Sequence, residues 1–288
     1  MKKYFFYLAI FLFISCNKDD DSKPTPYKFT FNYNLHSSLP TDWVDEFKKI
    51  MANLDKVIPI KPNDYLYELD IYVWNSSEDK PYKDKIGNTT GACICGNSKE
   101  RYMVLEIPQQ EFDNKAMHRY SVIPHEVFHA YEMGLSENFF KSDGLELKWM
   151  AEGGAASFES LYIQQYYSYD YFTNAQSQIH ADAVNNPKIF ESYDQSNGKD
   201  DNYASSVFMV LALVSELKKL NVSEEKAFKL IFKYFWKKNA SNSNWKTAFQ
   251  EVFNISADDF YSSLKNYSPS ITQVRPDPNL KLENIFSN

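Results

Sequence analysis

This chain contains few histidines and few cysteines, and it has no excess of positive charge. Its 288 residues include five histidines and three cysteines, and 31 basic residues stand against 38 acidic ones, a formal net charge of −7 at pH 7. Proteins that bind nucleic acid or an anionic membrane surface do so with clustered Lys and Arg. Neither partner is therefore expected here.

The chain also lacks an apolar run long enough to span a bilayer, which takes about 20 residues in a helix. The continuous apolar run Val207–Val214 is interpreted as part of a buried core helix. Hydrophobic residues make up 43% of the chain, with 21 Tyr and 22 Phe. This content suits a folded protein with a substantial core and argues against disorder. We expect a monomer.

The N-terminus has the pattern of an export signal. Lys2 and Lys3 precede the apolar stretch Tyr4–Ile14, and the small residue Ser15 comes just before Cys16. A charged start, an apolar core of this length and a small residue before the cut are typical of secretory signals. The run ending in Ser-Cys resembles a bacterial lipobox, which implies that Cys16 is the site of lipid attachment.

Residues 1–15 are thus expected to be a lipoprotein signal peptide, and residues 16–27 a flexible tether. The acidic run Asp19–Asp21 resembles the surface-export signal of some outer-membrane lipoproteins. We therefore expect an outer-membrane lipoprotein held by its lipid anchor only, on the cell surface in preference to the periplasmic face. The alternative is an ordinary cleaved signal followed by a solvated linker.

Two further cysteines, Cys93 and Cys95, lie two residues apart in a predicted strand. Alternate residues of a strand share a face but are awkwardly placed to bond to each other. The favoured interpretation is two small hydrophobic side chains. A disulfide is the alternative, since an oxidising compartment permits one. A zinc site built on this pair is not expected, because no other cysteine could complete it.

The clearest chemical signal is the run His125-Glu126-Val127-Phe128-His129. On a helix, residues four apart share a face, so both imidazoles can reach one metal ion. Two His ligands leave a zinc ion open positions, and a carboxylate beside a metal-activated water is what a hydrolase needs. A third protein ligand is expected, and Glu152 follows His129 by 23 positions (152 − 129). The alternative is a helix with two ordinary imidazoles.

An H-E-x-x-H run followed by W-x-x-E-G-x-A, here Trp149–Ala155, resembles the gluzincin superfamily of zinc metallopeptidases. The resemblance implies a thermolysin-like zincin fold and one Zn²⁺ held by His125, His129 and Glu152, with Glu126 as general base. It covers roughly residues 85–265 and is strongest over 125–160.

The superfamily also supplies a Tyr or His that stabilises the oxyanion. Tyr203 resembles that tyrosine in aminopeptidase-like members, and its rivals are His180 and Tyr193. Alternatively, Tyr203 is one of many tyrosines and only packs at the start of a helix.

For Glu159, His36, His118 and Trp149, the sequence indicates only a general environment. Glu159 lies two turns beyond Glu152 and is either an acceptor for a ligand imidazole or a solvated side chain. His36 and His118 have no partners at ligand spacing and are expected at the surface or in packing. Trp149 is expected to pack beneath the helix that carries the metal motif.

The predicted fold is α+β, with a thermolysin-like core. Residues 28–267 form the metallopeptidase unit, divided into a mixed sheet part (28–113) and a mostly helical part (114–267) that carries the active-site helix; 268–288 is an irregular tail. Strands are expected at 27–34, 67–74, 92–95 and 102–107, the last two as a hairpin. Helices are expected from Thr41 and at 116–133, 149–166, 171–184, 201–220, 224–238, 244–253 and 257–266.

Helix boundaries and breaks follow from particular residues. Ser223 and Ser256 are predicted N-caps. Gly134 is a predicted stop. Pro124 either restarts the motif helix or kinks it.

The resemblance also implies a role for the edge strand before the active-site helix, which in this superfamily pairs with the substrate backbone. The segment Gly91–Ile94 occupies that place, with Ala92 and Cys93 at the contact. Edge-strand pairing recognises an extended peptide with little demand on its side chains. An ordinary protected edge is the alternative.

Taken together, these patterns favour a zinc-dependent peptidase acting on protein or peptide outside the cytoplasm. An endopeptidase is favoured because the chain lacks the G-x-M-E-N run with which the aminopeptidase branch grips a free amine. Two alternatives remain. One is a surface lipoprotein that binds peptides or glycoconjugates without turnover, and the other is a zinc amidase acting on a non-peptide amide such as a cell-wall crosslink.

Overall fold

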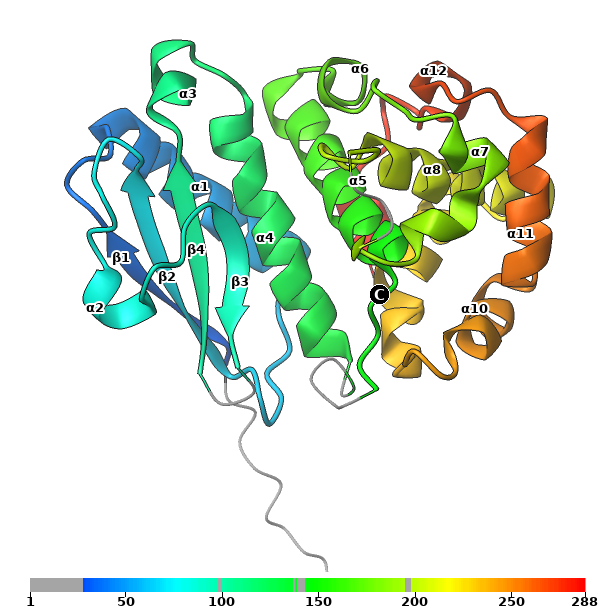
Figure 1. The fold of residues 1–288 in the computed structure, drawn as a ribbon, viewed down its shortest axis with the longest axis horizontal. Helices are drawn as coiled ribbons and strands as arrows, with labels where there is room; N and C mark the ends of the chain where they lie inside the picture. Colours follow the sequence, from blue (N-terminus) through cyan, green and yellow to red (C-terminus); the bar gives the residue numbers. More distant parts are fainter. Residues whose placement is uncertain (1–27, 98–99, 137, 139–142, 195–197, 288) are drawn as a thin grey trace, which may run out of the picture.

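A computed structural model describes residues 28–97, 100–136, 138, 143–194 and 198–287. The predicted signal peptide, Cys16 and the tether lie outside these residues. The fold is α+β, as predicted, with a mixed four-stranded sheet followed by a mostly helical part (Figure 1).

The strands are β1 Thr30–Leu35, β2 Glu68–Asn75, β3 Ala92–Gly96 and β4 Arg101–Ile107. The longer helices are α1 Thr41–Val57, α4 His118–Leu135, α5 Lys148–Tyr167, α8 Ala204–Lys219 and α10 Trp245–Phe253. The short helices are α2 Lys83–Ile86, α3 Gln109–Asp113, α6 Tyr171–Ala175, α7 Asp182–Asn185, α9 Glu224–Lys229, α11 Ala257–Ser263, α12 Ile271–Val274 and α13 Leu282–Phe286.

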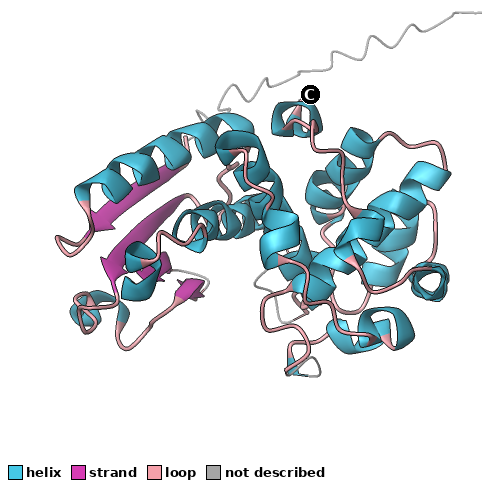
Figure 2. Cartoon of the chain, turned by 90° about the horizontal axis from the view of Figure 1, so that it is seen from above, coloured by secondary structure: helices cyan, strands magenta, loops and turns pink. Residues whose placement is uncertain are grey.

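The sheet has the strand order β1-β2-β4-β3. The first three are parallel, and β3 pairs antiparallel with β4 as the predicted hairpin, which leaves β3 at the edge. Because side chains alternate along a strand, residues such as Ile71 and Leu105 enter the main core with α1 and α4. Figures 1 and 2 show α4 lying between the sheet and the helical part.

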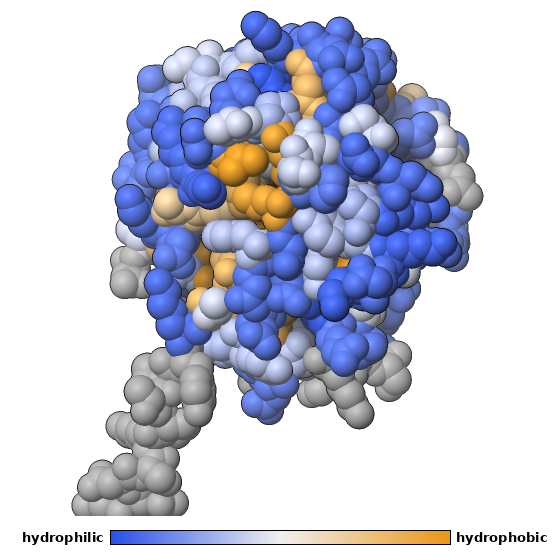
Figure 3. All heavy atoms as spheres, turned by 90° about the vertical axis from the view of Figure 1, so that its left-hand side faces the viewer, coloured by the Kyte–Doolittle hydropathy of each residue, from blue (hydrophilic) through white to orange (hydrophobic). Residues whose placement is uncertain are grey.

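The opposite face of the sheet carries a second, smaller cluster. It contains Tyr72, Trp74 and Val104, covered by Ile86 of α2 and by Tyr82. Seen from the left-hand side of Figure 1, the surface is mostly hydrophilic, with hydrophobic residues gathered in one central area (Figure 3). The sheet is therefore packed on both faces, which is usual where parallel strands dominate.

Helix α4 carries the metal motif and is continuous from His118 to Leu135, with Pro124 inside it. The helix does not restart at this proline. Gly134 was predicted to end this helix, but the helix ends one residue later, at Leu135. The glycine serves close packing instead. A Cβ on Gly134 would lie 2.8 Å from the Lys61 carbonyl oxygen. This glycine permits close packing of α4 on the loop after α1.

Helix α8 confirms the expectation for Val207–Val214, because these residues are all at most 2% exposed. Among the residues with assigned structure, every helix is too short or too polar to span a bilayer. Predicted caps are also confirmed: Ser223 Oγ accepts from Lys226 N at 3.3 Å, and Ser256 Oγ accepts from Asp259 N at 3.0 Å.

Several predicted helices are wrong in extent. The predicted helix 171–184 is two short helices, α6 and α7, because the segment between them bonds elsewhere: His180 N donates to Ser205 Oγ at 3.0 Å. The predicted helix 224–238 is α only up to Lys229, and a π-helical segment and a 3₁₀ turn follow.

The predicted irregular tail, 268–288, instead contains α12 and α13 and belongs to the core. The Phe286 ring packs against Phe158 and Phe232, with ring centroids 5.8 and 6.1 Å apart. Leu282 and Ile285 of α13 are at most 1% exposed. Sequence composition missed this segment because its helices are too short to show helical periodicity.

Helices α5 and α8 meet at Gly153. A Cβ built on this glycine would lie 2.5 Å from the Ser206 carbonyl oxygen and 3.0 Å from a Val210 methyl. The neighbouring glycine, Gly154, has room: its Cβ would lie 3.5 Å from Glu132 Oε1 and 3.6 Å from the Phe128 ring. The two adjacent glycines therefore differ in what they permit.

This difference gives a matched test of the α5–α8 contact. Gly153→Ala is expected to destabilise the fold by about 1–2 kcal/mol, because overpacking of 1–3 kcal/mol exceeds the gain in helix propensity. Gly154→Ala is expected to be neutral or to stabilise by up to about 1 kcal/mol. Thermal unfolding of both variants checks this. Equal melting temperatures for the two variants would contradict the close approach.

Candidate metal centre

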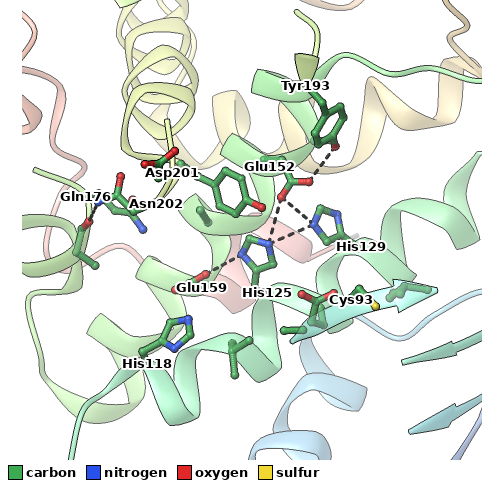
Figure 4. Close-up of a pocket in the computed structure, with 18 of the residues that line it drawn as sticks. Cys93, His118, His125, His129, Glu152, Glu159, Gln176, Tyr193, Asp201 and Asn202 are labelled. Atoms are coloured by element: carbon green, nitrogen blue, oxygen red, sulfur yellow. Dashed lines mark hydrogen bonds and ion pairs between the residues drawn. The ribbon is translucent and has the colours of Figure 1, made fainter. Parts of the chain in front are cut away.

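Two helices bring the predicted ligand residues together. Helix α4 presents His125 and His129 one turn apart, and α5 crosses it and presents Glu152 (Figure 4). The two Nε2 atoms lie 3.3 Å apart, and each lies 3.4 Å from Glu152 Oε2. In the described part of the chain, these three residues are the group of His, Cys, Asp or Glu side chains that could hold a metal ion.

The spacing of the three donor atoms fits a small tetrahedral dication. Ligand atoms at about 2.0–2.1 Å from a zinc ion, in tetrahedral directions, lie about 3.3–3.4 Å from one another. The observed triangle has sides of 3.3, 3.4 and 3.4 Å. Two imidazoles and one carboxylate are also a donor set of catalytic zinc sites, with a fourth position left for water. The residues present therefore fit such an ion.

Buried carboxylates orient both imidazoles. His125 Nδ1 lies 2.7 Å from Glu159 Oε2, and His129 Nδ1 lies 2.9 Å from Glu132 Oε2. A proton held on Nδ1 by a carboxylate leaves the Nε2 lone pair for a metal. Glu159 is itself held, since Ser121 Oγ donates to its Oε1 at 2.8 Å.

The predicted contact of Glu159 with a ligand imidazole is thus present, but no contact was predicted for Glu132. The sequence contained the information, because Glu132 is three residues after His129 on one helix and residues so spaced are neighbours.

The carboxylates of Glu132, Glu152 and Glu159 stabilise positive charge at the two imidazoles. Burial by itself would lower the pKa of His125, but hydrogen bonds to Glu152 and Glu159 outweigh it and raise the pKa to about 10. Burial would raise the pKa of Glu152, but the two imidazoles hold it well below its usual range. Burial raises the pKa of Glu132 to about 7, against the pull of His129. A cation is the species that this arrangement stabilises.

The cluster opens onto a cleft of about 990 Å³. Glu126 lines this cleft and is 5% exposed, and burial raises the pKa of its carboxyl group despite the nearby imidazoles. Within the described residues, no hydrogen bond or ion pair engages the Glu126 carboxylate. It is therefore available to exchange a proton with a molecule in the cleft.

Of the three candidates for an oxyanion donor, two lie at the site. The Tyr203 ring stacks on His125, with centroids 5.7 Å apart, and its hydroxyl has no hydrogen bond to the described residues. The Tyr193 hydroxyl donates to Glu152 Oε1 at 2.8 Å. His180 does not line the cleft, and its Nδ1 instead accepts from Asp182 N at 3.1 Å.

The edge strand forms one wall of the cleft. Ala92, Cys93 and Ile94 of β3 line it, as the sequence placed them. The favoured interpretation of the cysteines is wrong, because Cys93 and Cys95 form a disulfide. Their Cα atoms are 5.7 Å apart, within the range of 4.4–6.8 Å that a disulfide bridges. Alternate strand positions are therefore close enough after all.

Of the three other residues with an expected environment, His36 and His118 make polar contacts and Trp149 packs elsewhere than expected. His36 Nδ1 contacts Ser38 Oγ at 3.0 Å, away from the cleft. His118 lines the cleft and pairs with Glu111 through an Nδ1–Oε1 contact of 2.7 Å. Trp149 was expected beneath α4, which is wrong: its Nε1 donates to the Tyr261 hydroxyl at 3.0 Å, and its ring packs on α10 and α11.

Comparison with known proteins found no family model, no curated protein and no solved structure that matches this chain.

Metal binding itself can be measured through stability. Zn²⁺ at about 100 times its dissociation constant stabilises a folded protein by about 2.7 kcal/mol. For a chain of this size, that corresponds to a rise in melting temperature of about 5 °C. We expect this rise in wild type after removal of metals with a chelator, and its loss in Glu152→Ala.

Glu146→Gln is the matched control, because Glu146 lines the same cleft outside the cluster. It should retain the full rise. A wild type whose melting temperature ignores Zn²⁺ would refute the metal centre.

Proposed function

We propose that this chain is a zinc-dependent peptidase, an endopeptidase in preference to an exopeptidase, with a thermolysin-like core. The observation that carries the proposal is the buried carboxyl group of Glu126, which no described residue engages by a hydrogen bond or ion pair, beside the triangle formed by His125, His129 and Glu152. A protein that merely binds a metal or a peptide has no use for a proton acceptor at this place.

When bound, zinc would polarise the scissile carbonyl and lower the pKa of an attacking water. The protein's own residues supply the rest. Glu126 takes the proton from water and delivers it to the leaving nitrogen, a task that a raised pKa suits. Glu159 and Glu132 hold the imidazoles in orientation throughout, so that the ligand set does not reorganise during the reaction.

The two tyrosines have different roles in this proposal. Tyr203 has a hydroxyl without a partner among the described residues, so it can donate to the developing oxyanion. Tyr193 already donates to Glu152, and so it orients a ligand carboxylate. This division favours Tyr203 over Tyr193 as the oxyanion donor.

The shape of the cleft supports an extended peptide as substrate. Strand β3 pairs with β4 on one side and with no described strand on the other, and Ala92 and Cys93 lie along the cleft wall. A peptide can add to such an edge by backbone hydrogen bonds. Location at the outer membrane through a lipid on Cys16 remains part of the proposal, on the sequence pattern alone.

Glu126→Gln separates catalysis from binding. We expect the variant to lose about 10²–10⁴-fold in kcat on a denatured protein such as casein. Its zinc content, measured by atomic absorption, should stay at one ion per chain, because Glu126 is not a ligand. Unchanged cleavage would refute the role of Glu126, and a wild type that holds zinc but cleaves no peptide would favour the binding-only alternative.

Tyr203→Phe and Tyr193→Phe form a matched pair that removes one hydroxyl each. Tyr203→Phe is expected to lower kcat by about 10²–10³-fold and to leave zinc affinity unchanged. Tyr193→Phe is expected to weaken zinc binding about 10-fold or more. Steady-state kinetics and zinc titration with a competing chelator check both. If Tyr193 were the oxyanion donor and Tyr203 the residue that orients Glu152, Tyr193→Phe would lower kcat and Tyr203→Phe would weaken zinc binding.

A further inference from the structure

We propose that Lys148 is a positioning residue that holds Tyr193 and Tyr203 against the metal cluster. The proposal rests on the proposed function in one respect, that the cluster binds zinc. Neither the H-E-x-x-H motif nor the W-x-x-E-G segment gives Lys148 this role; it follows from contacts made by the first residue of α5.

Lys148 is a buried cation. Its side chain is 8% exposed, and its Nζ lies 3.9 Å from Asp200 Oδ2, a carboxylate that is itself fully buried. Lysine is almost never fully buried unless it is paired, because taking its charge out of water costs several kcal/mol. A buried lysine one turn before a metal ligand, Glu152, therefore calls for a reason.

The same ammonium group lies over two aromatic rings. Its distance to the ring centroid is 5.9 Å for Tyr193 and 5.6 Å for Tyr203. Both lie within the range of about 6 Å over which a cation and an aromatic face attract each other, and the attraction is stronger where water is excluded. One charge thus joins two tyrosines that come from separate segments of the chain.

Each tyrosine in turn contacts a metal ligand. The Tyr193 hydroxyl donates to Glu152 Oε1 (Figure 4). The Tyr203 ring stacks on His125, with centroids 5.7 Å apart. Tyr193 has an exposed fraction of 44%, so packing alone restrains it weakly. A cation fixed behind its ring supplies the restraint that burial does not.

The backbone around Lys148 strengthens this arrangement. Lys148 N donates to the Glu191 carbonyl oxygen at 3.1 Å, two residues before Tyr193. Asp200 accepts from Ser205 N at 2.7 Å and so caps the start of α8, next to Tyr203. Lys148 therefore holds the Tyr193 segment through its backbone and the Tyr203 segment through Asp200.

Tyr203 needs such support because its backbone is in the left-handed region, with φ of 60°. A non-glycine residue there is held by its surroundings and not by its own preference. The Lys148–Asp200 pair is a buried ionic contact next to this turn.

A double-mutant cycle on zinc affinity tests the proposal without relying on catalysis. The four proteins are wild type, Lys148→Met, Tyr193→Phe and the double variant, each titrated with Zn²⁺ against a chromophoric chelator. Tyr193→Phe should weaken binding about 10-fold, in the range for partners of metal ligands. Lys148→Met should weaken it several-fold in the wild-type background and less than about twofold in the Tyr193→Phe background.

Losses that simply multiply would overturn the proposal, since a purely structural lysine would act alike in both backgrounds. Lys148→Met removes the cation next to the buried Asp200 carboxylate, and this variant could fail to fold. Lys148→Met/Asp200→Asn removes that unpaired charge, and it should show the same loss of zinc affinity as Lys148→Met. Lys148→Arg keeps the cation and should retain affinity within about threefold.

The outcomes are distinguishable from failure of the proposed function. A wild type that binds zinc but cleaves no peptide refutes the peptidase, while the cycle still supports or overturns the role of Lys148. A wild type that binds no zinc overturns both.

Discussion

Two pairs, each of an imidazole and a buried carboxylate, determine the geometry of the cluster of His125, His129 and Glu152. Glu159 and Glu132 hold the Nδ1 atoms of His125 and His129, and this leaves both Nε2 atoms directed at Glu152. An imidazole ring without such a partner can rotate about its side-chain torsions. Because the pairs are formed within and between α4 and α5, any change in the crossing of these helices would change the cluster.

The crossing of α5 and α8 depends on Gly153, the residue directly after Glu152. Gly153 lets α8 approach within contact of the α5 backbone, whereas Gly154 faces Phe128 and Glu132 of α4 with room for a methyl group. The glycine after Glu152 therefore has a packing reason: it lets the helix that carries this candidate ligand lie close to α8. Close packing converts a sequence motif into fixed distances between donor atoms.

The sequence alone predicted the parts of the site that are local. The spacing of His125 and His129 on one helix, the hairpin before it and the amphipathic α1 all follow from patterns within about 20 residues. The α+β class and the convergence of Glu152 on the two histidines also agree with the structure. In each case, a short-range periodicity or a recognisable motif contains the information.

What the sequence did not predict depends on contacts between distant segments. Tyr193, from an irregular segment, reaches Glu152 across 41 positions. The segment between α6 and α7 is drawn out of a helix by the start of α8. Trp149 faces Tyr261 instead of α4. No periodicity encodes such pairings, because each is selected by tertiary packing over local preference.

The charges around the cluster explain how so many acids can be buried together. Glu126, Glu132, Glu152 and Glu159 are each at most 9% exposed. Buried carboxylates are tolerated when opposite charge or hydrogen bonds compensate them. The Nδ1 contacts of His125 and His129 compensate Glu159 and Glu132, and a divalent ion on the two Nε2 atoms would bring two further positive charges next to the acids. The acids that orient the two imidazoles therefore also make the site favourable for a cation.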